Sequence, residues 1–256
     1  YIAVFDVARI NREHMNAQEV MTTVYVRPAV DDFNAEVTNQ GRTLRHRFGC
    51  SGIDGLTLAP RWGKGRGRRM LYVAYGIYSE NDRTDNDYQV LLCYDVDKLR
   101  KHEQTLVPQN LHHSGPKKAD ATYYIHTGNT CWGVQNLCYD SHTGHMLAAV
   151  YPGKKPGWKN FGLYVADGQG KPTREVLKGV EPRTTGLVMP LLMQGEHDPA
   201  HDTWGWNFKW GSTGLVSLGD GRFYVSVGGR DKATGRQYCE ARLFRWEDQR
   251  GLVPVE

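Results

Sequence analysis

The heptapeptide Cys50-Ser-Gly-Ile-Asp-Gly-Leu56 decides the fold, because related stretches recur twice further along the chain. The two later copies are Cys131-Trp-Gly-Val-Gln-Asn-Leu137 and Lys209-Trp-Gly-Ser-Thr-Gly-Leu215. Their final leucines lie 81 and 78 residues apart. Self-similarity at a regular period is typical of repeat architectures, in which each repeat is one supersecondary unit.

Each copy is followed by short runs rich in strand-forming residues, separated by turn residues. The second runs are residues 71–75, 146–150 and 223–227, the third are 91–95, 163–167 and 243–247, and the fourth are 104–107, 174–177 and 252–255. The turns Asp140-Ser-His-Thr-Gly144 and Gly219-Asp-Gly221 have hairpin chemistry. The pattern therefore predicts repeated units of four antiparallel strands.

The N-terminal region fits a further unit. Its expected strands are residues 2–8, 22–27, 35–39 and 43–48, and residues 12–20 form the one stretch with helical spacing. The approximate units are 1–49, 50–108, 131–180 and 209–256, all within a single domain over 1–256.

A four-stranded sheet that recurs in this way buries both faces only when similar sheets stack around it. The sequence therefore predicts an all-β fold, a β-propeller of four or five blades, each a four-stranded antiparallel sheet, with long loops on one face. The repeat resembles that of the β-propeller superfamily in general over most of the chain. Neither a Trp-Asp repeat nor the Ser-x-Asp-x-Gly-x-x-Trp box of sialidases occurs, so the resemblance names no narrower family. A β-sandwich or two small β domains is the alternative.

Composition excludes several classes of protein. Hydrophobic residues make up 39% of the 256 residues, and the longest apolar runs are too short to span a bilayer as a helix. A net charge of +4 is too mild to indicate nucleic-acid binding. We therefore expect a small-molecule or oligosaccharide ligand, no nucleic-acid partner and no membrane, with the oligomeric state left open.

The five cysteines are odd in number and form no Cys-x-x-Cys pair, which favours buried thiols over a zinc site or a disulfide framework. The chain begins at Tyr1 without an initiator methionine. We read this as removal of a leader, with a secreted or periplasmic location expected.

Loop lengths indicate which face carries the site. Residues 109–130 and 181–208 connect successive units, and residues 76–87, 151–160 and 228–237 connect second to third strands; all of these segments are long. In a propeller they share one face, where binding and catalysis concentrate.

The first strand of each unit would bring polar side chains to the mouth of a central channel. These are Asp54, Gln135, Asn136 and Thr213, with Trp132 and Trp210 just before. Asp54 is the expected acid or orienting group, the amides and Thr213 are the expected substrate contacts, and the indoles are stacking platforms. The plainer interpretation is that these groups line a watery channel.

Histidines near the same face suit proton transfer or metal binding. His112 and His113 are candidates for a general base or a metal ligand, and His126 is a candidate metal ligand. Three histidines with Gln135 resemble the ligand set of certain propeller-shaped polysaccharide lyases, which implies one divalent metal ion. A solvated histidine pair is the alternative.

Two loops carry further candidates. Lys155 and Trp158 place a cation beside an aromatic ring, which suits an anionic sugar, although ordinary solvated charge is the alternative. The loop Asn81-Asp-Arg-Thr-Asp-Asn-Asp87 is either a calcium loop or a hydrophilic loop in which Arg83 pairs with its own neighbours.

Taken together, the residues predict a β-propeller enzyme of the hydrolase or metal-dependent lyase type. It would act on a carbohydrate or other polar, anionic substrate at the channel mouth. The alternative is a non-catalytic propeller that binds a glycan or a protein through the same face.

Overall fold

The computed structural model describes residues 1–63, 67–128 and 133–255 and is an all-β protein with a few short helices. The first half contains β1 (Ile2–Phe5), η1 (Val7–Arg9), α1 (Ala17–Val20), β2 (Met21–Val24), α2 (Arg27–Asn34), β3 (Glu36–Asn39), β4 (Arg42–Arg45), η2 (Arg47–Gly49), β5 (Cys50–Pro60), β6 (Arg69–Ile77), β7 (Tyr88–Asp95), α3 (Val96–Arg100) and β8 (Ala121–His126). The second half contains β9 (Val134–Tyr139), β10 (Met146–Val150), β11 (Leu163–Ala166), β12 (Thr173–Val176), β13 (Thr185–Val188), β14 (Glu196–Asp198), β15 (Thr203–Gly205), β16 (Gly214–Ser217), β17 (Arg222–Arg230), β18 (Gln237–Glu247) and β19 (Gly251–Pro254).

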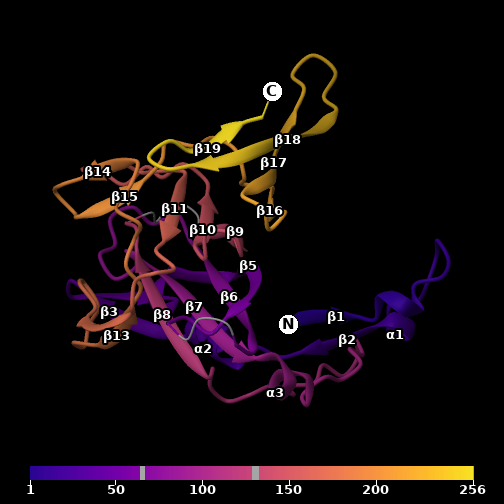
Figure 1. The fold of residues 1–256 in the computed structure, drawn as a ribbon. Coiled ribbons are helices and arrows are strands. Elements are labelled where there is room, and N and C mark those ends of the chain that lie inside the picture. The colour runs from indigo at the N-terminus through magenta and orange to yellow at the C-terminus, as the bar shows by residue number, and fades with distance from the viewer. Residues whose placement is uncertain (64–66, 129–132, 256) are drawn as a thin grey trace.

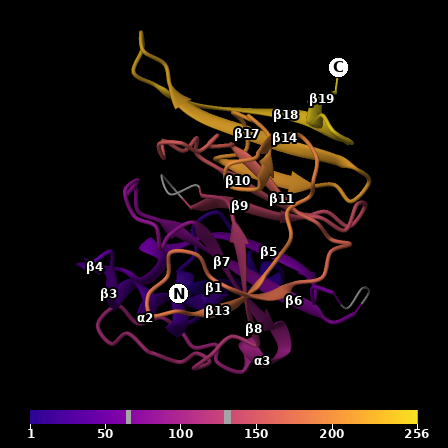
Figure 2. The same ribbon diagram turned by 90° about the vertical axis from the view of Figure 1, so that its left-hand side faces the viewer.

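Three sheets are stacked in the order in which the chain builds them (Figures 1 and 2). The first has six strands in the order β12-β13-β8-β7-β6-β5, the second has the order β11-β10-β9, and the third is the meander β16-β17-β18-β19. Three two-stranded pairs, β1-β2, β3-β4 and β14-β15, lie outside these sheets.

The stacking follows from the alternation of side chains along each strand. In β7, Leu91 and Cys93 point into a core shared with the second sheet, whereas Val90 and Leu92 point into a core on the opposite face. Every residue of β7 is therefore buried, as expected of a strand covered on both sides. A third core fills the space between the second and third sheets.

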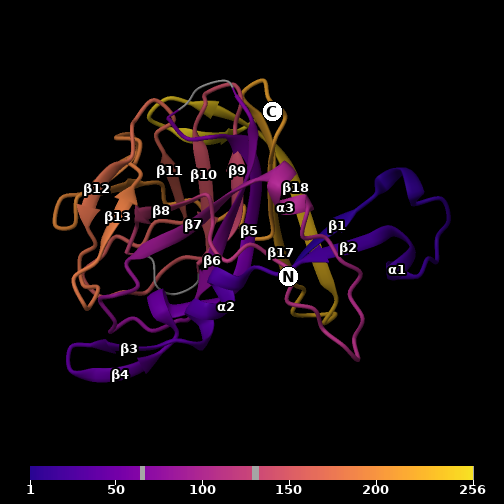
Figure 3. The same cartoon turned by 90° about the horizontal axis from the view of Figure 1, so that it is seen from below.

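The outer face of the first sheet is covered by α2, which packs against β5, and by other N-terminal elements (Figure 3). Pro28 stands in the first turn of α2, where its missing N–H costs nothing. Asp95 caps α3 by accepting from the amides of Asp97 and Lys98. The protruding β1-β2 hairpin lies to one side of the stack (Figure 1).

Much of the predicted strand pattern is present. The three runs of the unit over 50–108 are β5, β6 and β7, paired as an antiparallel meander, and the last unit is the predicted four-stranded sheet. The N-terminal runs form the β1-β2 and β3-β4 hairpins, and α1 lies within the stretch of helical spacing.

Two predicted fourth strands are wrong. Residues 104–107 form no strand, and β8 takes their place beside β7. The run near 174–177 is β12, but it pairs with β13, whose parallel contact with β8 places it in the first sheet rather than beside β11. Long connections let distant strands occupy these edges, which repeat spacing alone does not predict.

The predicted closure of a ring by pairing of the two ends is not seen. Within the part of the chain that the structure describes, β19 pairs with β18 and β1 pairs with β2. The described sheets thus stack without closing. None of the helices in the described ranges is long and apolar enough to cross a membrane.

Candidate functional site

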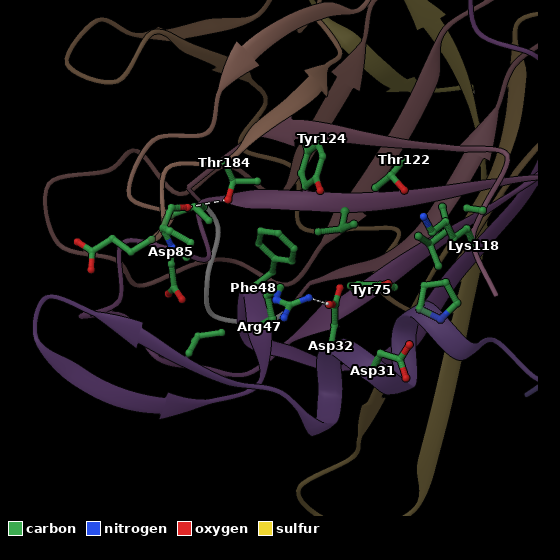
Figure 4. Close-up of a pocket in the computed structure, with 18 of the residues that line it drawn as sticks. Asp31, Asp32, Arg47, Phe48, Tyr75, Asp85, Lys118, Thr122, Tyr124 and Thr184 are labelled. Carbon is green, nitrogen blue, oxygen red and sulfur yellow. Dashed lines mark hydrogen bonds and ion pairs between the residues drawn. The ribbon is translucent and has the colours of Figure 1, made fainter.

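A cavity of about 560 Å³ lies on the outer side of the first sheet, between that sheet and α2 (Figure 4). Tyr124 and Thr122 reach it from β8, and Asp31 and Asp32 reach it from α2. We call this cavity the Asp32 pocket. Its remaining lining includes Arg47, Phe48, Tyr75, Asp85, Lys117, Lys118, Glu181 and Thr184.

Asp32 is the group in this pocket with the most perturbed chemistry. Its side chain is 13% exposed, and an oxygen accepts from Arg47 Nη1 at 3.1 Å. Burial raises the pKa of Asp32 to about 6, against the lowering effects of the Arg47 charge and the Tyr75 hydroxyl. Arg47 is 49% exposed, so solvent screens its charge and desolvation of the carboxyl prevails. Asp32 can therefore hold or release a proton near neutral pH.

Tyr75 supplies a buried hydroxyl beside this carboxyl. The residue is 1% exposed, and its hydroxyl lies near enough to Asp32 to lower the pKa of that group. No hydrogen bond of ordinary geometry joins the hydroxyl to any residue between 1 and 255 that the structure describes. A buried hydroxyl without a partner carries a free-energy cost that a ligand hydroxyl would remove.

Arg83 fixes the segment that presents Arg47 and Phe48. Its guanidinium is 1% exposed, donates twice to Asp85 at 2.7 and 2.8 Å, and donates to Glu80 at 2.8 Å. It also donates to the carbonyls of Arg45 and His46, each at 2.9 Å. The sequence-based expectation that Arg83 pairs with its own neighbours is thus confirmed.

The anchored segment is strained. Phe48 has a φ of 57° and His46 a φ of 67°, a left-handed conformation that costs a bulky residue about 1–2 kcal/mol. Strained residues persist where surrounding contacts hold them, and they cluster at ligand sites. The Arg83 network supplies those contacts, so it positions the aromatic wall of the Asp32 pocket.

Comparisons of the chain with protein-family models, with curated proteins and with solved structures find no match. The function therefore rests on the chemistry of the sites.

The residues expected at a channel mouth lie where the first strands of the sheets meet. Gln135 donates to Asp54 at 3.3 Å, which joins β9 to β5, and Asn136 donates to the carbonyl of Gly211 at 2.6 Å. Burial raises the pKa of Asp54, while the Gln135 bond lowers it. Thr213 hydrogen-bonds to Ser226 at 3.1 Å.

The predicted histidine set does not assemble. His112 Nε2 bonds to Thr23 at 2.8 Å, and the His113 ring packs on Tyr25 at 4.7 Å, both beside the β1-β2 hairpin. His126 instead lies against Trp158, with ring centroids 5.5 Å apart. No group of three or more His, Cys, Asp or Glu in the described ranges is placed to hold a metal ion. These residues therefore do not fit the divalent ion implied by the lyase resemblance.

Lys155, Trp158 and His126 do come together, but in a different setting from the one expected. Lys155 is 8% exposed and forms a buried ion pair with Asp87, and its ammonium lies 5.4 Å from the Trp158 ring. This cation is therefore committed to an internal partner rather than available to an anionic ligand.

The two remaining predicted indoles differ in what can be said of them. Trp210 is buried in the third core, with Arg242 over its ring at 4.9 Å and Phe244 beside it. Trp132 lies outside the described residues.

The sequence-based analysis missed Asp32, Arg47 and Tyr75. Asp32 lies on α2, a helix that the sequence pattern did not reveal, although proline in a first turn followed by a polar-apolar alternation is a helix signal. Tyr75 was recognised only as part of a strand.

Proposed function

We propose that the chain is a carbohydrate-active enzyme of the glycoside hydrolase type, with its sugar in the Asp32 pocket and Asp32 as the proton donor. The observation that carries the proposal is a buried carboxyl, perturbed by desolvation, beside an unpartnered buried hydroxyl in a cavity of about 560 Å³. Cavities of this size hold small-molecule ligands.

A general acid for glycosidic bond cleavage must remain protonated until the leaving oxygen arrives. A carboxyl with a pKa of about 6 meets that requirement close to neutral pH. Glycosidases need a second carboxyl across the sugar bond. Asp85 is held by two bonds from Arg83, so Asp31 and Glu181 are the candidates from this pocket.

The walls suit a polar ring-shaped ligand. The Phe48 ring and Tyr124 offer flat surfaces for a sugar face, and the Tyr75 hydroxyl offers a hydrogen bond for a sugar hydroxyl. Lys117 and Lys118 also line the pocket, which favours a sugar that carries a carboxylate over a neutral one.

Asp54 with Gln135 is a second candidate acid. Its support is the interstrand hydrogen bond and the raised pKa described above. We further propose that the three stacked sheets are neighbouring blades of an open propeller, since β5, β9 and β16 pack against each other in chain order. An experimental structure in which these three strands share no axis would overturn the blade arrangement.

The test is hydrolysis of a panel of aryl glycosides, neutral and uronic, followed by release of the aryl alcohol. We expect Asp32→Asn to lower the rate by about 10²–10⁴-fold, while Asp220→Asn, an exposed carboxyl paired with Arg222, keeps it. If Asp54→Asn abolishes the rate and Asp32→Asn does not, the site lies at the β5-β9 contact instead. Binding of a glycan without turnover would indicate a non-catalytic module.

A further inference from the structure

A second cavity, of about 240 Å³, lies where the β14-β15 hairpin meets the first sheet. We call it the His201 pocket. It is lined by Tyr88, His126, Glu175, Lys178, Val188, Met189, Pro190, Leu191, Met193, His201, Asp202 and Trp204. None of the residues that line the Asp32 pocket lines this one.

His201 is held in one orientation by Asp198. The imidazole Nδ1 lies 3.1 Å from Asp198 Oδ2, and the Asp198 side chain is 5% exposed. Burial works against the charge of Asp198, but the Lys159 amide and the His201 ring hold the pKa of that carboxyl below its ordinary value. An ionised carboxylate on Nδ1 favours the tautomer with its proton there, which leaves Nε2 as an acceptor.

Trp158 fixes the face of the same imidazole. The two rings are stacked with centroids 3.7 Å apart and 13° between their planes. Trp158 in turn packs so closely on Gly128 that a Cβ there would lie 2.0 Å from its ring. Within the part of the chain that the structure describes, Nε2 of His201 has no hydrogen-bond partner. This nitrogen is therefore oriented, unoccupied and on the wall of a cavity.

We propose that the His201 pocket is a second reaction site, in which His201 acts as general base and then general acid in the hydrolysis of a small, uncharged ester. Carboxylate, imidazole and cavity are arranged as in the base half of a catalytic triad. No hydroxyl or thiol nucleophile lines the cavity, so water is the nucleophile.

In the first step the water oxygen bonds to the ester carbonyl carbon while Nε2 takes one water proton. Lys178 and His126 line the same cavity and are the groups available to the oxyanion that forms. Burial lowers the pKa of His126 to about 4, so this imidazole is neutral and offers one N–H. In the second step the ester C–O bond breaks, and the imidazolium returns its proton to the departing oxygen, which gives an acid and an alcohol.

The lining favours an uncharged substrate. Glu175 and Asp202 outnumber the single cation Lys178, so an anion would be repelled. Met189 and Met193 belong to an apolar wall that suits a short acyl chain, and the volume limits that chain to a few carbons.

His197 provides a matched control. It lies in the same hairpin, is stacked on Trp204 with centroids 4.3 Å apart, and lies 3.2 Å from Asp202, but it does not line the cavity. The two histidines thus share a stacked indole and a carboxylate partner, and they differ in access to the His201 pocket.

The experiment measures hydrolysis of p-nitrophenyl acetate and butyrate by the whole chain, with free imidazole at equal concentration as the reference. We expect the wild-type rate to exceed that reference and His201→Gln to lower it by about 10²–10⁴-fold, with His197→Gln within about twofold of wild type. Asp198→Asn should lower the rate and also shift the His201 ¹⁵N signals toward the other tautomer.

A wild-type rate equal to that of free imidazole, or equal losses in the two histidine variants, would overturn the proposal. Thermal unfolding of each variant identifies any loss that comes from misfolding, and unchanged ester hydrolysis in Asp32→Asn separates this site from the Asp32 pocket. A folded His201→Gln protein with full activity would likewise refute the role of His201.

Discussion

Replacement of Asp32 by asparagine should remove one component of the pH dependence of stability. Burial raises the pKa of Asp32 from 3.8 to about 6 in the folded chain. The folded state therefore binds this proton more tightly than the unfolded state, so the resulting stabilisation is fully present below pH 3.8 and is lost as pH rises through about 6. At about 1.4 kcal/mol for each pH unit, the loss is about 3 kcal/mol. The side chain is 13% exposed, so solvent screening reduces this little.

The assay is urea unfolding at intervals from pH 3.5 to 7.5, comparing the wild type with Asp32→Asn. We expect the difference in unfolding free energy between the two proteins to change by about 3 kcal/mol across that interval, in favour of the variant at high pH. Asp31→Asn is the matched control: its neighbouring charge raises the pKa of Asp32, so its removal should move the profile to slightly lower pH without reducing its size. Parallel profiles for the wild type and Asp32→Asn would refute the reasoning.

Three further perturbations test other parts of the structure. Lys155→Met leaves Asp87 buried without its cation and should cost about 3–5 kcal/mol in urea unfolding at pH 7; an equal stability would contradict a buried ion pair. Gly128→Ala should cost more than about 1 kcal/mol, because φ is +60° and the new Cβ meets Trp158; unchanged indole fluorescence and stability would argue against this packing. Among the four described cysteines, Cys239 is exposed and the other three are buried, so peptide mapping after brief maleimide treatment should find Cys239 labelled first.

The strands that form local hairpins were predictable from the sequence. β6 and β17 are β-rich runs bounded by turn residues, and each pairs with a neighbour along the chain, so spacing alone fixes its partner. β12 and β13 were not predictable in this way. They are four residues long, and their sheet is set by a parallel contact with β8 made across a long connection.

The site shows the same division. Arg83 pairs with Asp85 two residues away, a contact within reach of reasoning about one loop. The meeting of Asp32, Arg47 and Tyr75 depends on how α2 and η2 pack on the first sheet. Desolvation, the dominant cause of the raised pKa of Asp32, is a property of that packing and leaves no trace in residue spacing.

The most direct measurement is the titration of the Asp32 side-chain carboxyl carbon by ¹³C NMR, assigned by its loss in Asp32→Asn. The account predicts a midpoint at about pH 6 in the wild type and a higher one in Arg47→Met, because Arg47 lowers the pKa of this carboxyl. A midpoint near 3.8 would contradict the assignment of Asp32 as a proton donor at neutral pH.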